Sequence, residues 1–405
     1  MTVAEATHAS DLLAAATIRE RCRNILAAAL EGRSRHFRVE RARLDDAAAR
    51  VAAVTRRRYP DLSIPYHSRW RHFEAGGIDR NAELNAALAS RDRMDAARAR
   101  IDLAVVSVLL DAGAGAAWSY VEQASGQRFT RSEGLGVASF RAFMAGTFSA
   151  KRDDPLRVDS AALEALDEVT LANIFQASAQ NPLVGLQGRT LLLRRLGAAL
   201  AREHAYFGER RRPGALFDVL TADRRTEVRA SALLRALLGG LGSIWLAGNR
   251  LDDVPVGDAW RHPHAGGSGP TAGWVPFHKL SQWLAYSLFE PIEASGVSMA
   301  ETDVLTGLPE YRNGGLLLDT GVLTLVDGKA AHVSHDVGEE LVVEWRALTV
   351  ALLDELATRV RERLGIDLPL ARILEGGTWA AGRELAQELR GGEPPLAIRS
   401  DGTVF

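Results

Sequence analysis

The sequence lacks the features that would place it outside the cell or in a membrane. Its single cysteine, Cys22, excludes a disulfide and a cysteine-rich zinc site. No apolar run approaches the roughly 20 residues that span a bilayer. The N-terminus has no basic stretch followed by an apolar segment, as a secretory signal would have. We therefore expect a cytoplasmic protein that makes no membrane contact.

A large excess of charge is absent as well. The 405 residues include 49 basic and 51 acidic side chains, for a net charge of -2. Nucleic-acid-binding domains usually carry a strongly basic surface, so nucleic acid is not an expected partner. Lysine occurs only at Lys151, Lys279 and Lys329, and nearly every other cation is arginine. A lone lysine in such a chain offers a compact, titratable amine, which arginine cannot supply.

The familiar motifs of nucleotide and acyl-transfer enzymes are missing. There is no G-x-S-x-G elbow, no Walker loop and no G-x-G-x-x-G opening a helix after a strand. The pairs His262–His264 and His332–His335 have metal-like spacing, but no HExxH-type carboxylate accompanies them. We expect solvated loop histidines at these positions, with no bound metal and no cofactor.

Helical periodicity dominates what is present. The expected helices span residues 17–32, 43–60, 94–115, 188–208, 227–248, 276–293 and 340–365. Residues 314–328 alternate loosely between glycines and predict a small β-hairpin. Residues 252–274 form the longest helix-poor segment, a candidate lid or binding loop. We expect a mainly α, multi-helical single domain over residues 1–405, or helical subdomains of residues 1–150 and 151–405.

The segment "PYHSRWRHFEAGGIDR" gathers polar and aromatic side chains before two glycines. Arg69 and Arg71 supply forked donors suited to phosphate or carboxylate, and Trp70 supplies a stacking face beside His72. A surface loop pinned by Arg–Glu pairs explains the same composition, and both interpretations stay open. Asp111, which ends an apolar helix just before glycines, is a further candidate.

The segment "LTGLPEYRNGG" sets Glu310, Tyr311 and Arg312 side by side between glycines and a proline. Such a row predicts a site whose side chains are positioned by a stiff loop, with a backbone conformation set by Gly and Pro, rather than by a helix. Lys279 and Trp283 lie one turn apart on the expected helix that precedes it.

Glu344 and Arg346 interrupt the apolar helix expected over residues 340–365. Because they are two residues apart, they point in different directions. A buried charge is costly unless it is paired, so each needs its own partner elsewhere in the chain. We interpret both as members of structural salt bridges.

Long blocks of the sequence resemble the uracil-catabolism protein 4 family. The blocks are PYHSRWRHFEAGG, LLDAGAGAAW, RSEGL, NPLVGLQGR, VPFHKLSQWLAYSLFEP, LTGLPEYRNGGLLLDTGVL, VVEWRALTV, LEGGTWAAGRELA and SDGTVF. They extend over nearly the whole chain. The resemblance implies a role in a pyrimidine degradation route in which urea is released from a ribosylated intermediate.

Four shorter blocks resemble the queuosine-salvage N-glycosidases. They are Phe277, Lys279 and Gln282; Tyr311 and Arg312; Gly321 and Leu323; and Glu344 and Arg346. His278 stands where that family has tyrosine, and Glu310 where it has aspartate. This resemblance implies a helical fold similar to DNA glycosylases and hydrolysis of an N-glycosidic bond.

The two resemblances together imply roles for individual residues. Glu310 would be the catalytic carboxylate and Lys279 its partner, with a plain salt bridge between them as the alternative. The implied substrate-binding residues are His278, Trp283, Tyr311, Arg312, Arg69, Trp70, Arg71, His72 and Asp111. The implied partner is a small nucleoside-derived or nucleotide-derived substrate, and arginines would clamp any 5'-phosphate.

Two other functions fit the same sequence. One is a metal-dependent amidohydrolase step on a pyrimidine nucleotide, which would require bound zinc or iron. The other is a non-catalytic binding or scaffold protein of the pathway, which would bind nucleotide or protein without turnover.

Overall fold

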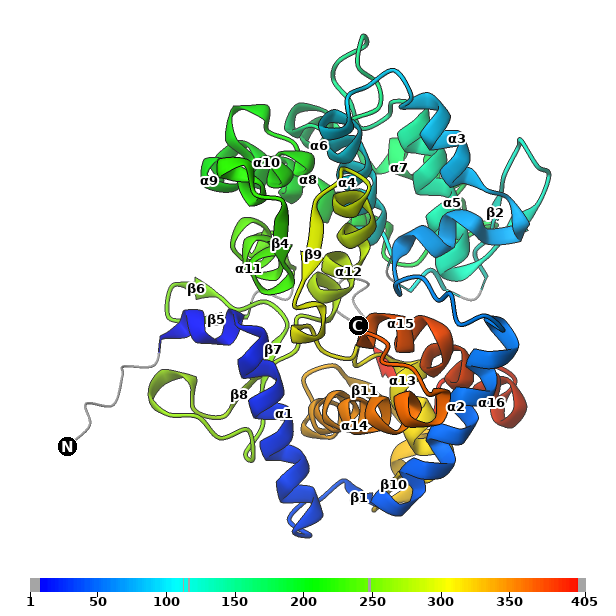
Figure 1. The fold of residues 1–405 in the computed structure, drawn as a ribbon, viewed down its shortest axis with the longest axis vertical. Coiled ribbons are helices and arrows are strands. Elements are labelled where there is room, and N and C mark those ends of the chain that lie inside the picture. The colour runs from blue at the N-terminus through cyan, green and yellow to red at the C-terminus, as the bar shows by residue number, and fades with distance from the viewer. Residues whose placement is uncertain (1–7, 112, 116, 247–248, 400–405) are drawn as a thin grey trace. The chain divides into compact units, whose positions relative to one another are not determined.

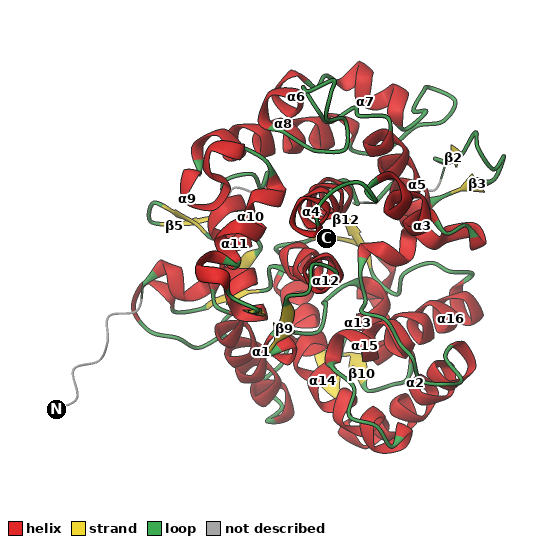
Figure 2. Cartoon of the chain, turned by 45° about the horizontal axis from the view of Figure 1, so that its top comes forward, coloured by secondary structure: helices red, strands yellow, loops and turns green. Residues whose placement is uncertain are grey.

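The structure, a computed structural model, describes residues 8–111, 113–115, 117–246 and 249–399 (Figure 1). Helices dominate it (Figure 2). The α-helices are α1 (Ala15–Leu30), α2 (Leu44–Arg58), α3 (Arg80–Ala87), α4 (Arg93–Leu109), α5 (Arg131–Met144), α6 (Ser160–Ala165), α7 (Glu168–Ile174), α8 (Leu186–Arg202), α9 (His204–Phe207), α10 (Leu216–Leu220), α11 (Ala230–Leu241), α12 (Lys279–Glu293), α13 (Tyr311–Asp319), α14 (Glu340–Leu364), α15 (Leu370–Ile373) and α16 (Trp379–Arg390). The expected mainly α fold is confirmed.

Short helical turns and strands connect the α-helices. The 3-10 turns are η1 (Ala9–Leu13), η2 (Arg41–Arg43), η3 (Arg69–Gly77), η4 (Gly208–Arg210), η5 (Pro213–Ala215), η6 (Ala222–Arg224), η7 (Gly269–Thr271), η8 (Thr302–Val304) and η9 (Gly328–His332), and η10 (Leu374–Thr378) is a π-helix. The strands are β1 (Phe37–Val39), β2 (Tyr120–Val121), β3 (Arg128–Phe129), β4 (Glu227–Arg229), β5 (Arg250–Leu251), β6 (Val254–Pro255), β7 (Ala259–Arg261), β8 (Trp274–Pro276), β9 (Ser298–Ala300), β10 (Leu323–Leu325), β11 (Ser334–Asp336) and β12 (Ala397–Arg399).

The strands pair two by two. The pairs β2–β3, β5–β6 and β7–β8 are antiparallel neighbours in sequence, whereas β1 pairs antiparallel with the distant β10. The pairs β4–β9 and β11–β12 are parallel. None of these sheets exceeds two strands in the described residues, so the helices carry the core.

The expected helices agree closely with the observed ones. They coincide with α1, α2, α4, α8 with α9, α11, α12 and α14, although β4 occupies the start of the segment expected to form α11. Within the part of the chain that is described, no helix combines the length and apolarity needed to cross a bilayer.

The β-hairpin predicted for residues 314–328 is wrong in its location. Its first half belongs to α13, and its second half is β10, whose Leu325 pairs with Phe37 of β1. The helix continues through Gly314 because a tryptophan packs directly against that glycine. A Cβ at position 314 would lie 2.6 Å from the indole of Trp345, so the residue is small for packing rather than for turning.

The chain divides into two compact units, each built from separate segments. Unit 1 contains the described residues of Met1–His67, Gly248–Gln282 and Glu301–Arg399, and unit 2 those of Ser68–Ala247 and Trp283–Ala300. The chain passes from unit 1 to unit 2 inside α12. The single domain expected for the whole chain stays a prediction.

The core of unit 1 forms around α14, a helix of 25 residues. Helices α1 and α2 both pack against it (Figure 1), and α13 packs against α16. Helix α1 contributes Ile18, Cys22 and Ile25 at helical spacing, and all three are buried. The same periodicity that predicts the helix therefore also supplies its packed face.

Unit 2 buries a charged group together with its apolar core. The Glu122 side chain is buried and receives hydrogen bonds from Arg80 at 2.6 and 2.8 Å and from Arg141 at 2.6 Å. Burial raises the pKa of Glu122, but hydrogen bonds from Arg80, Ser125 and Arg141 outweigh it and lower that pKa to about 2. The carboxylate thus ties α3 and α5 to strand β2.

Candidate active site

Glu310 is the N-cap residue of α13 in unit 1. Its Oε1 accepts from the Asn313 backbone N–H at 2.6 Å, and its Oε2 accepts from that of Arg312 at 2.8 Å. These bonds satisfy amides that a helix start leaves unpaired and fix the orientation of the carboxylate. The prediction that a special loop backbone rather than a helix holds this row is wrong, because Tyr311 and Arg312 form the first turn of α13.

Arg312 follows Glu310 and is 7% exposed. Its guanidinium carbon lies 3.9 Å from the ring centroid of Trp379 and 5.3 Å from that of Tyr311. Its Nε donates to the Tyr311 hydroxyl at 3.0 Å, while its two Nη groups donate to no other described residue. This largely buried guanidinium on an aromatic platform therefore has a fork that no other residue in the described part of the chain occupies, which suits an anionic or hydroxyl-rich ligand.

A carboxylate–imidazole pair, Glu375 with His67, lies near the Trp379 ring. Glu375 sits on the π-helix η10, and its carboxylate bonds the His67 Nδ1 at 2.9 Å, Arg58 at 3.1 Å and the Tyr59 hydroxyl at 3.2 Å. The His67 ring lies 6.1 Å from that of Trp379. Burial raises the pKa of Glu375, but His67 and Arg58 outweigh it and leave that pKa below its usual range.

Sequence reasoning did not single out Glu375 or Arg58. The one signal was "LEGGTW", where an acidic residue precedes two glycines inside a helical stretch. Gly377 is needed for close packing on α2, because a Cβ at this position would lie 2.4 Å from the Thr55 hydroxyl. Wide π-type turns of this kind occur often at functional sites.

Lys279 begins α12, and its backbone N–H is held by the largely buried carboxylate of Asp258. The Lys279 N–H donates to Asp258 Oδ2 at 3.0 Å, and both Asp258 oxygens accept from the Arg346 fork at 2.7 Å. The Arg346 guanidinium also lies 4.1 Å from the Phe277 ring centroid. Burial raises the pKa of Asp258, but Arg346 outweighs it and lowers that pKa. Asp258 is thus the partner that the sequence required for Arg346.

Gln282, one turn beyond Lys279, ties α12 to the loop that leads to Glu310. Its Oε1 accepts from the Thr306 backbone N–H at 2.8 Å, and its Nε2 donates to the Thr306 hydroxyl at 2.7 Å. Gln282 is fully buried, so this link is protected from water. The structure therefore connects the helix start at Lys279 to the Glu310 loop, while a direct Lys279–Glu310 pairing stays a prediction.

His278 lies immediately before α12 in unit 1. It has a positive φ of 48° and is buried, with its Nε2 2.8 Å from the Leu12 carbonyl oxygen. Burial lowers its pKa, more than the hydrogen bond to that carbonyl raises it. His278 is therefore a neutral ring that donates to the backbone, and its predicted contact with substrate stays untested.

The remaining predicted binding residues lie in unit 2. They are Arg69, Trp70, Arg71, His72, Asp111 and Trp283. Arg69 is fully buried: its Nε donates to Ser107 at 2.6 Å, and its Nη1 pairs with Asp111 at 3.1 Å. Burial lowers the pKa of Arg69, and Asp111 partly restores it.

These unit 2 residues have different environments. The Trp70 indole donates to the Ser287 carbonyl at 2.7 Å, and Arg71 pairs with Glu290 at 2.8 Å. The His72 ring lies 5.8 Å from that of Trp283. The Arg–Glu interpretation therefore holds for Arg71, whereas Arg69 and Trp70 are core residues rather than surface ones. The binding interpretation of this segment stays a prediction.

The prediction that the four loop histidines are solvated is wrong for two of them, His262 and His335. His262 is 2% exposed with Nε2 3.4 Å from Glu344, and His335 is 6% exposed between Glu339 and a backbone carbonyl. Their burial is tolerated because both nitrogens of each ring have a partner: Glu344 and the His264 N–H for His262, and Glu339 and the Ala330 carbonyl for His335. The buried Glu344 also accepts from the hydroxyl of Ser34, so its partners among the described residues are a hydroxyl and an imidazole, not the lysine or arginine of an ordinary salt bridge.

Comparison with known proteins gives full-length matches. The family model described as "Protein of unknown function (DUF1688)" matches residues 11–405. The protein named Uracil catabolism protein 4 from Lachancea kluyveri is 40% identical, with 93% of each chain covered. Protein urg3 from Schizosaccharomyces pombe is 37% identical, covering 97% of this chain and 98% of that one. The chain therefore belongs to the uracil-catabolism protein 4 family, as the blocks found in its sequence had implied.

Proposed function

We propose that this protein acts in uracil catabolism as a hydrolase of N-glycosidic bonds. The substrate would be a ribosylated urea or a pyrimidine-derived ribonucleotide, and the products the free urea or base and the sugar. The pathway is supported by the name of the Lachancea kluyveri relative, which is 40% identical over nearly the whole chain. The chemistry is supported by the arrangement of Glu310 and Arg312 at the start of α13.

The reaction places specific demands on the site. Water adds to C1' of the ribose as the C1'–N bond breaks, and the departing nitrogen takes up a proton. Positive charge develops on the sugar, so a fixed carboxylate lowers the barrier by stabilising it or by orienting the water. Glu310 is suited to this role because two backbone N–H groups hold its side chain in place.

The neighbouring residues would bind the rest of the substrate. Arg312 presents a free fork above Trp379, which fits a 5'-phosphate or ribose hydroxyls. Lys279 would position the carboxylate or hold the leaving group, because Gln282 links its helix to the Glu310 loop. The observation that carries the proposal is an immobilised carboxylate, Glu310, two residues before a guanidinium whose Nη groups pair with no other described residue.

The test is release of urea from ribosylurea and from its 5'-phosphate by the purified protein. Glu310→Gln should lower kcat at least 100-fold, whereas Glu310→Asp keeps the charge and should retain more activity. Asp327→Asn is the control, since the Asp327 carboxylate also caps a helical turn, η9, where it accepts from the Lys329 N–H. Unchanged turnover in Glu310→Gln removes Glu310 from the mechanism, and no turnover of either substrate by the parent protein contradicts the proposed function.

A further inference from the structure

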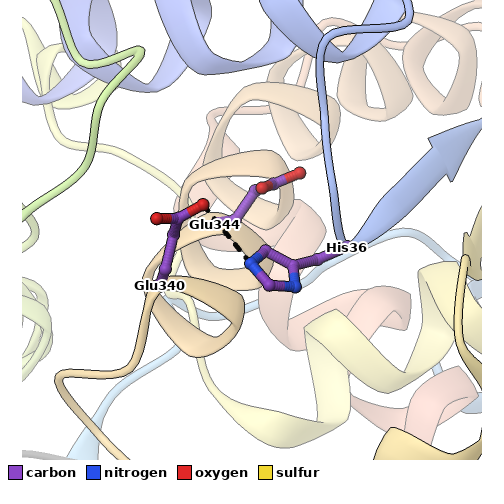
Figure 3. A group of neighbouring side chains, drawn as sticks. All are labelled: His36, Glu340 and Glu344. Atoms are coloured by element: carbon purple, nitrogen blue, oxygen red, sulfur yellow. Dashed lines mark ion pairs between the residues drawn. The ribbon is translucent and has the colours of Figure 1, made fainter.

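Three potential metal ligands meet where β1 approaches the start of α14 in unit 1. His36 immediately precedes β1, and Glu340 and Glu344 lie one turn apart on α14 (Figure 3). One ligand atom from each of the three lies within 4.8 Å of the other two. His36 Nε2 and Glu340 Oε1 are 3.4 Å apart, and ligands of a tetrahedral metal are also separated by about 3.4 Å.

Glu344 is the inner member of the cluster and is 1% exposed. Its partners are the Ser34 hydroxyl and the His262 Nε2, at 3.4 Å from Oε2. No lysine or arginine of the described chain pairs with it. A buried carboxylate without a full cationic partner is costly, so a positive charge at this position would stabilise the fold.

The two partners of Glu344 orient it as outer-shell residues orient metal ligands. Ser34 Oγ accepts from the backbone N–H groups of His36 at 3.2 Å and Phe37 at 2.9 Å, so its proton points to Glu344. The His262 Nδ1 accepts from the His264 N–H at 3.2 Å, so in the neutral ring the proton on Nε2 faces Glu344. Each Glu344 oxygen still has a lone pair available for an ion.

Glu340 and His36 form the open side of the cluster. Their side chains are 37% and 27% exposed, so an ion can enter from solvent. Glu340 and Glu344 are like charges four residues apart on a helix, an arrangement that destabilises a helix unless something separates the charges. The backbone of His36 is held in place next to the β1–β10 ladder, because its carbonyl accepts from the Val326 N–H at 2.9 Å.

We infer that His36, Glu340 and Glu344 bind a divalent first-row metal ion, although the sequence predicted no metal. One imidazole nitrogen and two carboxylate oxygens suit Zn²⁺ and Mn²⁺. Three protein ligands leave a coordination position for water. The site is independent of the N-glycosidic proposal, because ion binding is measured without substrate or turnover.

The experiment is calorimetric titration of chelator-treated, dialysed protein with Zn²⁺ and, separately, with Mn²⁺. The parent protein should bind one ion per chain, and both His36→Gln and Glu340→Gln should weaken binding at least tenfold. These side chains are partly exposed, so the variants should fold, which thermal unfolding checks. His335→Gln is the control, since His335 pairs with Glu339 outside the cluster. Equal affinity in parent and His36→Gln, or no binding at millimolar metal, overturns the inference.

Discussion

The guanidinium carbon of Arg312 lies 3.9 Å from the ring centroid of Trp379, while Arg312 Nε donates to the Tyr311 hydroxyl at 3.0 Å. A cation in the first turn of a helix opposes the helix dipole, which favours negative charge there. The aromatic contacts offset that cost, and among residues 8–399 that the structure describes none accepts from the Nη groups of Arg312. A residue placed against local preference in this way is typical of binding sites.

Replacing this guanidinium tests its role in binding. Arg312→Lys keeps the charge but loses the planar fork and the stack, so the KM for the 5'-phosphorylated substrate should rise at least tenfold, about 1.4 kcal/mol. Steady-state kinetics of urea release measure this. Arg383→Lys is the control, because exposed Arg383 lies 5.7 Å from the same ring. An equal KM increase in both variants would argue against a specific role for Arg312.

The Asp258–Arg346 pair should be important for stability. Asp258→Asn leaves Arg346, which is 1% exposed, without its bidentate partner, so the free energy of unfolding should fall by about 3–5 kcal/mol. Urea unfolding followed by circular dichroism measures the loss. Asp336→Asn removes an exposed carboxylate paired with Arg399 and should leave the midpoint unchanged. Similar effects of the two substitutions would contradict this prediction.

Acid should weaken unit 2 through Glu122. Its pKa in the folded protein is lowered from 4.5 to about 2, so its stabilising contribution is complete above pH 4.5 and is lost as pH falls toward 2. Glu122→Gln should therefore be much less stable than the parent protein at pH 7, and the difference should shrink below pH 4.5. Urea unfolding of both proteins between pH 7 and pH 3 tests this. A difference that does not change with pH would be inconsistent with the lowered pKa.

Cys22 should be chemically inert in the folded protein. It is fully buried on α1, and burial, followed by the charge of Asp354, raises the pKa of its thiol strongly. The reactive thiolate is therefore scarce and inaccessible. Thiol titration with a disulfide reagent should detect no free cysteine in native protein and one per chain in denaturant. Rapid labelling of native protein would show that α1 opens.

Gly314 should not tolerate a methyl group. Its added Cβ would lie 2.6 Å from the Trp345 indole, and overpacking of this kind costs about 1–3 kcal/mol. Gly314→Ala should lower the urea midpoint, whereas Gly328→Ala, where nothing lies within 4 Å, should not. Equal midpoints for the two variants would show that α13 can move away from α14.

The sequence predicted the helices well because their signal is local. The apolar face of α1, Ile18 with Cys22 and Ile25, can be identified from spacing alone, and the structure buries it. The hairpin error has a different origin. Glycines at 314 and 315 usually suggest a turn, but the reason for Gly314 is Trp345, a residue of another helix that no local pattern reveals.

The residues that meet in the candidate site are far apart in the chain, and no local sequence pattern shows which of them pair. The spacing of Glu344 and Arg346 showed that each needs a partner, but not that the partners are Ser34 and Asp258. His67 and Glu375 are 308 positions apart, so neither draws attention alone. The proline-rich and glycine-rich neighbourhood of His262 likewise gives no sign that its side chain is buried.

The interleaving of the two units has a practical consequence for dissecting this protein. Unit 1 draws on three separate stretches of the chain, and the second of them ends within α12. Any single cut between residues 8 and 399 divides unit 1, because its first and last segments lie at opposite ends of the described chain. Truncation from either end should therefore disrupt unit 1, so point substitutions are the suitable way to probe its candidate site.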